Sequence, residues 1–237
     1  MVQQQSRQTL QDAVSAERFA AAKSFGEYIE SIKQNQHKIA DNLAKASVPP
    51  DLARRLQSLA ARPDGPAKML VIGEDWCPDV YRGIPVAKKI ADAAGFELRI
   101  LERDQNMDAI QPFRKGGEFD SIPVFIFYTR DHRYLAHWIE RPRKANDEMR
   151  EALSPVFGPS GTRQLSEKLG REPTDEEKAA ARAEAAERYD EFQAGSPYWA
   201  RWREYTVEEV VDLLEGAMGD TASEQRGPLI PANDPER

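Results

Sequence analysis

Cysteine is almost absent from this sequence, which has only Cys77 among 237 residues. A single cysteine cannot form a disulfide within the chain, so packing alone must hold the fold. Basic charge is not in excess either, because 40 acidic residues against 33 basic ones give a net charge of −7, which argues against a broad nucleic-acid surface. No apolar run reaches the about 20 residues of a membrane-spanning helix, and no apolar block follows the N-terminus as in a secretory signal. We therefore expect a cytoplasmic protein that binds neither nucleic acid nor a membrane.

Motifs for bound metals and nucleotides are also absent. Of the three histidines, His132 and His137 lie five residues apart, a spacing that puts strand residues on opposite faces. The sequence contains no zinc-ligand spacing, Gly-rich phosphate loop, dinucleotide fingerprint or nucleophile elbow. We expect no metal site and no tightly bound cofactor.

Hydrophobic periodicity divides the chain into a helical N-terminal part and an α/β part. Residues 9–46 show the apolar spacing of a helix, and the turn-rich residues 62–66 follow. The periodicity after this joint predicts strands at 68–72, 96–101, 124–128 and 134–139, with helices at 79–94 and 106–115. The order is β-α-β-α-β-β.

A second helical region interrupts the α/β part before its last helix. Capping boxes at Thr174 and Thr206 predict an Ala-rich helix and a final helix, with aromatic residues between them. We divide the chain into an N-terminal helical extension at 1–62, an α/β domain at 63–218 with a helical insertion at 145–205, and a flexible C-terminal tail at 219–237. The added helices are candidate surfaces for a homo-oligomer or a protein partner.

The only cysteine lies in the turn between the first predicted strand and the first predicted helix of the α/β part. Unpaired N–H groups and the dipole at a helix N-terminus stabilise a thiolate. Glu74, Asp75 and Asp79 lie within three residues of Cys77, and their negative charges would raise its pKa. The balance of these effects has no sure sign, so Cys77 is either a working thiol or a small buried side chain.

Several short motifs together resemble thioredoxin-like proteins, in particular bacterial ones that lack the second active-site cysteine. The motifs are Glu74-Asp75-Trp76-Cys77 with Asp79, then Gly116-Gly117, Ser121-Ile122-Pro123 and Arg141-Pro142-Arg143. The resemblance implies a thioredoxin-like α/β fold, with a central mixed sheet flanked by helices and with Pro123 in the cis form facing Cys77. Val80 stands where thioredoxins have their second cysteine, so one chain cannot complete the dithiol reaction.

The leading hypothesis is a monothiol redox protein that exchanges with protein or glutathione thiols and disulfides, with glutathione as a candidate co-substrate. Cys77 would be the nucleophile and Asp79 its proton shuttle, although an acidic residue near a helix start is more often a cap. The candidate substrate-binding residues are Trp76, Ile122, Pro123, Arg141 and Arg143. Trp76 could equally be a half-buried core edge, and ion pairs with the acidic insertion would also explain the two arginines. The rival hypothesis is a redox-inactive thioredoxin-fold module for protein interaction.

Overall fold

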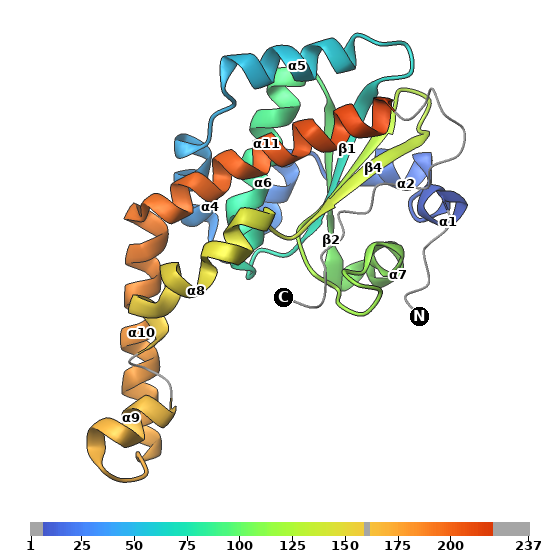
Figure 1. Ribbon diagram of the computed structural model, residues 1–237. Coiled ribbons are helices and arrows are strands. Elements are labelled where there is room, and N and C mark those ends of the chain that lie inside the picture. The colour runs from blue at the N-terminus through green and yellow to red at the C-terminus, as the bar shows by residue number, and fades with distance from the viewer. Residues whose placement is uncertain (1–6, 159–161, 220–237) are drawn as a thin grey trace. The chain divides into compact units, whose positions relative to one another are not determined.

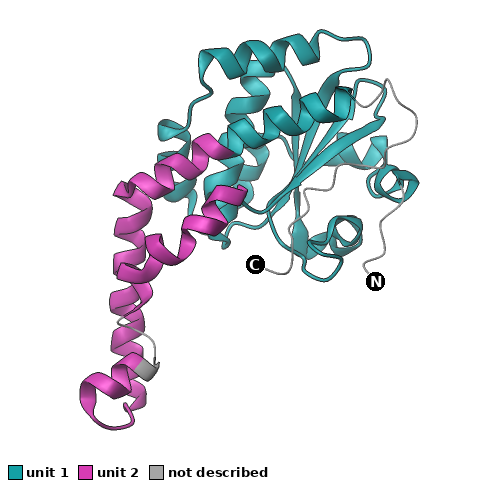
Figure 2. Ribbon diagram, viewed as in Figure 1, with its two compact units in different colours: residues 1–141, 206–237 teal, residues 142–205 magenta. Residues whose placement is uncertain are grey.

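The computed structural model describes residues 7–158 and 162–219 (Figure 1). Contacts divide the chain into two units: one contains the described residues up to Arg141 and from Thr206, and the other is Pro142–Tyr205 (Figure 2). The helices of the first unit are α1 (Arg7–Asp12), α2 (Ala16–Ala21), α3 (Phe25–Ser31), α4 (Gln36–Lys45), α5 (Pro50–Ala60), α6 (Pro78–Ala94), α7 (Met107–Ile110) and the 3₁₀ turns η1 (Arg103–Gln105) and η2 (Gln111–Phe113). The predicted domain boundaries at 62 and 145–205 stay predictions, and the tail from 220 onward lies outside the described residues.

A four-stranded mixed sheet forms the centre of the first unit. Its strands are β1 (Pro66–Gly73), β2 (Glu97–Glu102), β3 (Val124–Thr129) and β4 (Tyr134–Ile139), in the order β2-β1-β3-β4. Strands β1 and β2 are parallel, whereas β3 pairs antiparallel with both β1 and β4. Continuous apolar runs in β1 and β3 are buried on both faces, as expected for central strands. The predicted α/β thioredoxin-like fold with additional helices is therefore confirmed.

Helices cover both faces of this sheet (Figure 1). On one face, Phe125 packs against Trp138, whose indole N–H donates to Glu209 of α11 (Pro197–Gly219). On the other face, Phe19 of α2 packs against Tyr128. The sheet is thus the middle layer of three, and its core is closed on both sides.

The N-terminal segment forms four short helices where the sequence predicted one helical run over 9–46. Ser15 caps α2, and Ser24 caps α3 through a capping box with Glu27, so each serine starts a new helix after a break. Asn35 adopts a left-handed conformation with φ of 58°, which ends the third segment before α4. The predicted continuous helix is wrong because these local hydrogen bonds favour new starts.

This segment also protects both edges of the sheet. Lys23 forms an antiparallel bridge with Ile100 of β2, and Gln11 accepts the backbone N–H of Tyr134 in β4 and donates to His132 O. Exposed strand edges invite pairing with other chains, so the segment covers both of these edges.

The second unit contains α8 (Arg143–Phe157), α9 (Thr162–Leu169), α10 (Asp175–Gly195) and the first part of α11. Trp199 and Trp202 are buried, and the Trp202 indole donates to Glu148 of α8. The predicted helix start at Thr206 is wrong, because α11 begins at Pro197, where Ser196 accepts the N–H of Tyr198. None of the helices in the described ranges is long and apolar enough to cross a membrane.

Candidate functional site

Cys77 occupies the N-cap of α6, directly after the turn that leaves β1. Its backbone carbonyl accepts the N–H groups of Val80 and Tyr81 at 3.0 and 3.1 Å, which fixes the sulfur at the first turn of the helix. The thiol is half-buried and donates to the carbonyl oxygen of Ile122 at 3.8 Å. The predicted thiol turn and the Ile122-Pro123 loop therefore lie together.

The Ile122–Pro123 peptide bond is cis, and both residues are buried. Pro123 O accepts the N–H of Glu140, which joins this loop to the segment after β4. A Cβ at Gly83 of α6 would lie only 2.9 Å from the Pro123 ring. Glycine at this position is what lets the proline loop rest against the helix that carries the thiol.

Val80 fills the place of a second active-site cysteine. It is fully buried, and a Cβ at Gly73 would lie 2.9 Å from one of its methyl groups. The position is therefore packed with hydrocarbon against the end of β1, and Cys77 is the only sulfhydryl in the sequence.

Asp79 is the centre of a chain of ion pairs beneath the thiol turn. One carboxylate oxygen accepts from Arg82 at 2.6 Å, and the other accepts from Arg141 at 2.5 Å. Arg141 also donates to Glu140 at 2.5 Å, and Glu140 in turn pairs with Lys115 at 2.6 Å. Asp79 is therefore an anchor for two guanidinium groups, a connection that neither a helix cap nor a proton shuttle would require.

Burial raises the pKa of the Cys77 thiol above its ordinary value, and the negative charge of Asp79 raises it further. Hydrogen bonds from the backbone N–H groups of Val80 and Asp79 and the positive charge of Arg141 oppose this rise without cancelling it. The sequence left open whether the pKa of Cys77 is raised or lowered, and burial makes it higher than usual. At neutral pH the sulfur is a thiol in almost every molecule, because even an unperturbed cysteine is only about 3% thiolate at pH 7.

The other acidic residues of the turn tie it to neighbouring segments. Glu74 accepts the backbone N–H of Asp104 at 2.7 Å, just beyond the end of β2. Asp75 accepts the backbone N–H groups of Lys33 and Gln34, and its own carbonyl accepts from the Asn35 amide at 2.8 Å. The turn that carries the thiol is thus fastened to the N-terminal segment and to the end of the adjacent strand.

Trp76 is 44% exposed, and the guanidinium of Arg103 lies 5.0 Å from the centre of its ring. Arg103 was missed at the level of sequence, as was Glu140, whereas Arg82 was expected about one helical turn after Cys77 and pairs with Asp79. Strands β1 and β2 are parallel, so the residues that follow their carboxyl ends lie at the same edge of the sheet. Arg103 directly follows β2, so this rule could have placed it near the thiol turn after β1. No comparable sequence signal identifies Glu140.

The two arginines predicted to bind a substrate carboxylate belong to different units of the chain. Arg141 belongs to the first unit and binds Asp79 and Glu140, whereas Arg143 is exposed at the start of α8 in the second unit. Their roles in binding substrate stay predictions. The described residues contain no group of His, Cys, Asp and Glu side chains suited to a metal ion.

The three-layer fold, with a thiol at the start of α6 opposite the Ile122–Pro123 bond, defines a thioredoxin-like protein. A family model described as thioredoxin matches residues 22–154, more than half of the chain, so the chain belongs to the thioredoxin family. No curated protein matches it.

Two crystal structures resemble this chain at 18% identity. One is an HIV epitope scaffold, with a TM-score of 0.52 over 86% of this chain and 98% of the other. The second is a protein of unknown function from Pseudomonas aeruginosa, with a TM-score of 0.50 over 75% of this chain and 98% of the other. At this identity the likeness shows the fold alone.

Proposed function

We propose that this protein is a monothiol member of the thioredoxin family that carries out thiol–disulfide exchange at Cys77. The observation that supports this most is the position of the half-buried sulfur at the N-cap of α6, 3.8 Å from Ile122 O and next to the cis peptide bond to Pro123. In this proposal a partner disulfide would reach the half-buried sulfur beside the exposed Trp76. The resemblance of the motif Glu74-Asp75-Trp76-Cys77 with Asp79 to single-cysteine bacterial thioredoxin-like proteins also supports the proposal.

The exchange needs two steps and an external thiol. Cys77 loses its proton to solvent, and the thiolate attacks one sulfur of a partner disulfide, whose other sulfur leaves as a thiolate and takes up a proton. The product is a mixed disulfide between Cys77 and the partner. A second thiol then attacks the partner sulfur of that bond and expels the Cys77 thiolate, which is reprotonated. In a reducing cytoplasm, small thiols or reduced proteins supply this second thiol.

The raised pKa of Cys77 sets the pace of both steps. Attack is slow at neutral pH because little thiolate is present, and Cys77 is a poor leaving group because low-pKa thiols leave faster. We therefore expect exchange that accelerates through the alkaline range and a mixed disulfide that persists. In this proposal Asp79 contributes a fixed negative charge that keeps the sulfur protonated.

The test is the reaction of the full chain with bis(2-hydroxyethyl) disulfide, followed by intact mass from pH 6 to pH 10. A +76 Da adduct should form on the native protein, faster with rising pH, and 2-mercaptoethanol should reverse it. The Cys77→Ser variant should form none. Lack of an adduct at pH 9 on the folded protein, with ready formation after unfolding in urea, would show that the thiol is inert.

A redox-inactive interaction module is the second candidate, and the raised thiol pKa together with the exposed Trp76 and Phe119 favours it. In that case a partner would bind the Cys77→Ser variant as tightly as the original protein. A Trp76→Ala variant would then lose binding while keeping its thiol. The exchange hypothesis predicts the reverse pattern for a covalent partner, with capture abolished by Cys77→Ser.

A further inference from the structure

Glu140, the residue directly after β4, has a left-handed backbone conformation with φ of 68°. This region costs free energy for an L-residue, because its Cβ crowds the following carbonyl oxygen, and only glycine adopts it routinely. Non-glycine residues stay in such conformations only when the surrounding structure holds them there. Glycine would fit this backbone better, so the side chain of Glu140 is the feature that needs an explanation.

The contacts of Glu140 lead to the loop that faces the thiol. Its backbone N–H donates to Pro123 O at 2.7 Å. One carboxylate oxygen accepts from Lys115 at 2.6 Å and the other from Arg141 at 2.5 Å. The Glu140 side chain is only 16% exposed, so these ion pairs are partly shielded from water. Almost any residue could supply the N–H group, but binding both cations requires the carboxylate.

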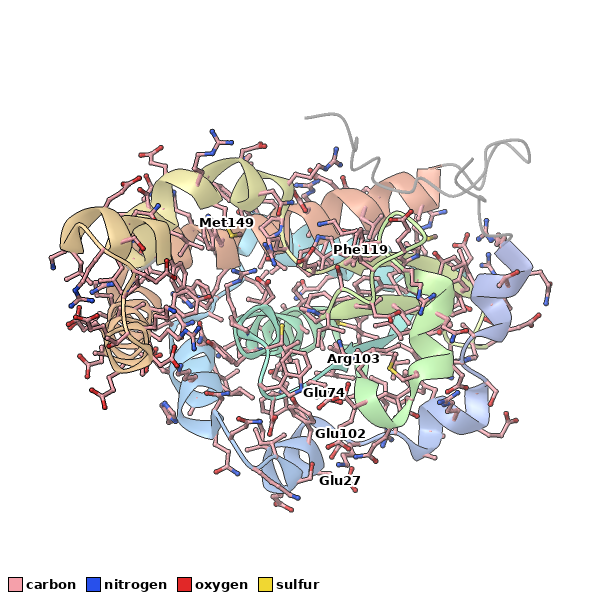
Figure 3. All side chains as sticks on the ribbon, turned by 90° about the horizontal axis from the view of Figure 1, so that it is seen from below. Glu27, Glu74, Glu102, Arg103, Phe119 and Met149 are labelled. Atoms are coloured by element: carbon pink, nitrogen blue, oxygen red, sulfur yellow. The ribbon has the colours of Figure 1, made fainter. Side chains whose placement is uncertain are left out.

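Lys115 begins the turn that precedes the Ile122-Pro123 loop. It forms an antiparallel bridge with Phe119, and the intervening Gly116-Gly117 pair is left-handed, with φ of 62° and 78°. Phe119 is 64% exposed and is labelled in Figure 3, so burial of this side chain does not hold the turn in place. The ion pair between Lys115 and Glu140 fastens the turn to the end of β4.

The other end of this loop carries the hydrogen-bond acceptor of the thiol. Ile122 O accepts from the Cys77 sulfur at 3.8 Å, and a hydrogen bond to the neutral form favours the protonated thiol. An S–H group is a weak donor, so this bond depends on a carbonyl that is held in place. Arg103 also donates to the loop, at Asp120 O, but at 3.5 Å. The shorter contacts that fasten the loop are those of Glu140.

We propose that Glu140 is a positioning residue for the thiol: its carboxylate, bound by Lys115 and Arg141, holds the Ile122-Pro123 loop where Ile122 O accepts the Cys77 proton. This role rests on the proposed exchange at Cys77 and names the residue that regulates that same thiol. Arg141 continues from Glu140 to Asp79 in the first turn of α6, so one chain of ion pairs joins the loop to the helix that carries the sulfur.

The test uses two variants that remove opposite charges from one ion pair, Glu140→Gln and Lys115→Gln. If the thiol responded to charge alone, the pKa of Cys77 would fall in the first variant and rise in the second. Because both variants release the loop, we expect the pKa to fall in both. The thiolate fraction at pH 7 should rise about twofold in each, as for the loss of one weak hydrogen bond. The pH dependence of iodoacetamide alkylation of the full chain, followed by intact mass, gives the thiol pKa.

A third variant separates positioning from stability. Glu140→Gly keeps the N–H group for Pro123 O and removes both the backbone cost and the carboxylate. In urea it should be more stable than Glu140→Gln, yet its thiolate fraction should rise by the same factor. Glu215→Gln is the matched control, because it removes an α11 carboxylate that Arg55 binds at 2.7 Å, and it should leave the thiol pKa unchanged.

Opposite pKa shifts in Glu140→Gln and Lys115→Gln, or no shift in either, overturn the positioning role. The exchange itself then stands, because alkylation requires no disulfide. A thiol that alkylates only after unfolding overturns the exchange instead. Hydrogen exchange by NMR then decides the positioning role, because the amides at positions 119 and 140 should exchange faster in both glutamine variants, and unchanged exchange overturns that role as well.

Discussion

Replacing Asp79 by asparagine should make Cys77 more reactive and the protein less stable in a single step. The carboxylate of Asp79 raises the pKa of the thiol, an effect second to that of burial. The same carboxylate binds the guanidinium groups of Arg82 and Arg141 at 2.6 and 2.5 Å. Asparagine keeps the shape of the side chain and loses its charge. The substitution should therefore raise the reactivity of the thiol and lower the free energy of unfolding.

The stability term follows from burial of the ion pairs. Arg82 exposes 1% of its side chain and Asp79 12%, whereas Arg141 exposes 22%. Removing one partner of a buried ion pair costs about 3–5 kcal/mol. We expect a loss of about 3 kcal/mol in the free energy of unfolding, toward the lower end because the Arg141 pair is partly solvated and an amide can still accept one hydrogen bond.

The reactivity term follows from Coulomb's law and from thiolate chemistry. A nearby unit charge is worth a few kcal/mol at an effective dielectric constant of about 20, so loss of the Asp79 charge should lower the pKa of the Cys77 thiol. Cys77 is only half-buried, so solvent should weaken this effect. Thiolate nucleophilicity decreases with pKa with a coefficient of about 0.4–0.5, so each tenfold gain in thiolate at pH 7 should raise the exchange rate by only about threefold to fourfold.

Three measurements check this prediction. The pH dependence of iodoacetamide alkylation gives the thiol pKa, exchange with bis(2-hydroxyethyl) disulfide at pH 7 gives the rate, and urea unfolding gives the stability. Asp92→Asn is the matched control, because it removes an exposed carboxylate paired with Lys88 from the same helix, α6. A thiol pKa that stays the same or rises in Asp79→Asn would refute the electrostatic argument. Unchanged stability would refute the assignment of Asp79 as an anchor.

Two further predictions concern positions away from the thiol itself. Val80→Cys should let the protein resolve its own mixed disulfide and raise insulin reduction by dithiothreitol about tenfold or more. Val80→Ala, which loses similar packing and adds no thiol, should not. Burial lowers the pKa of His137 from 6.5 to about 4, so the unfolded chain takes up a proton at a higher pH than the folded protein does. The free energy of unfolding should therefore fall by about 3 kcal/mol as the pH drops from 6.5 to about 4, and urea titrations of His137→Gln should show a flatter pH dependence.

The elements with strong local signals were predictable from the sequence. The apolar runs of β1 and β3 and the alternation in β2 predicted strands close to their observed bounds. Ser24 with Glu27 is a capping box that the sequence also contains, and it would have divided the predicted helix over 9–46. Thr206 with Glu209 has the same spacing inside α11, where Thr206 is buried, so this pattern does not by itself locate a helix start.

The connections of the candidate site were not predictable, because they join residues far apart in the sequence. Asp75 binds the backbone of Lys33, 42 residues away, and Asp79 binds Arg141, 62 residues away. Such pairs depend on how α3 and the end of β4 come to lie near the thiol turn. The sequence could place Cys77 and the Ile122-Pro123 loop in one neighbourhood only through the family resemblance.

A carboxylate near a cysteine is often taken as evidence for acid–base chemistry, yet here each one has a structural task. Glu74 accepts the backbone N–H of Asp104 in η1, and Asp75 accepts that of Lys33 in the N-terminal segment. Asp79 forms ion pairs with two arginines. Their charges bear on the sulfur all the same, since that of Asp79 raises the pKa of Cys77, as burial does. A thiol with a raised pKa attacks rarely and leaves reluctantly, so any mixed disulfide it forms is long-lived compared with that of a low-pKa thiol. Under the proposed exchange, the arrangement therefore favours long retention of a partner over rapid turnover, and the lifetime of the Cys77 adduct is the measurement that separates these two modes of action.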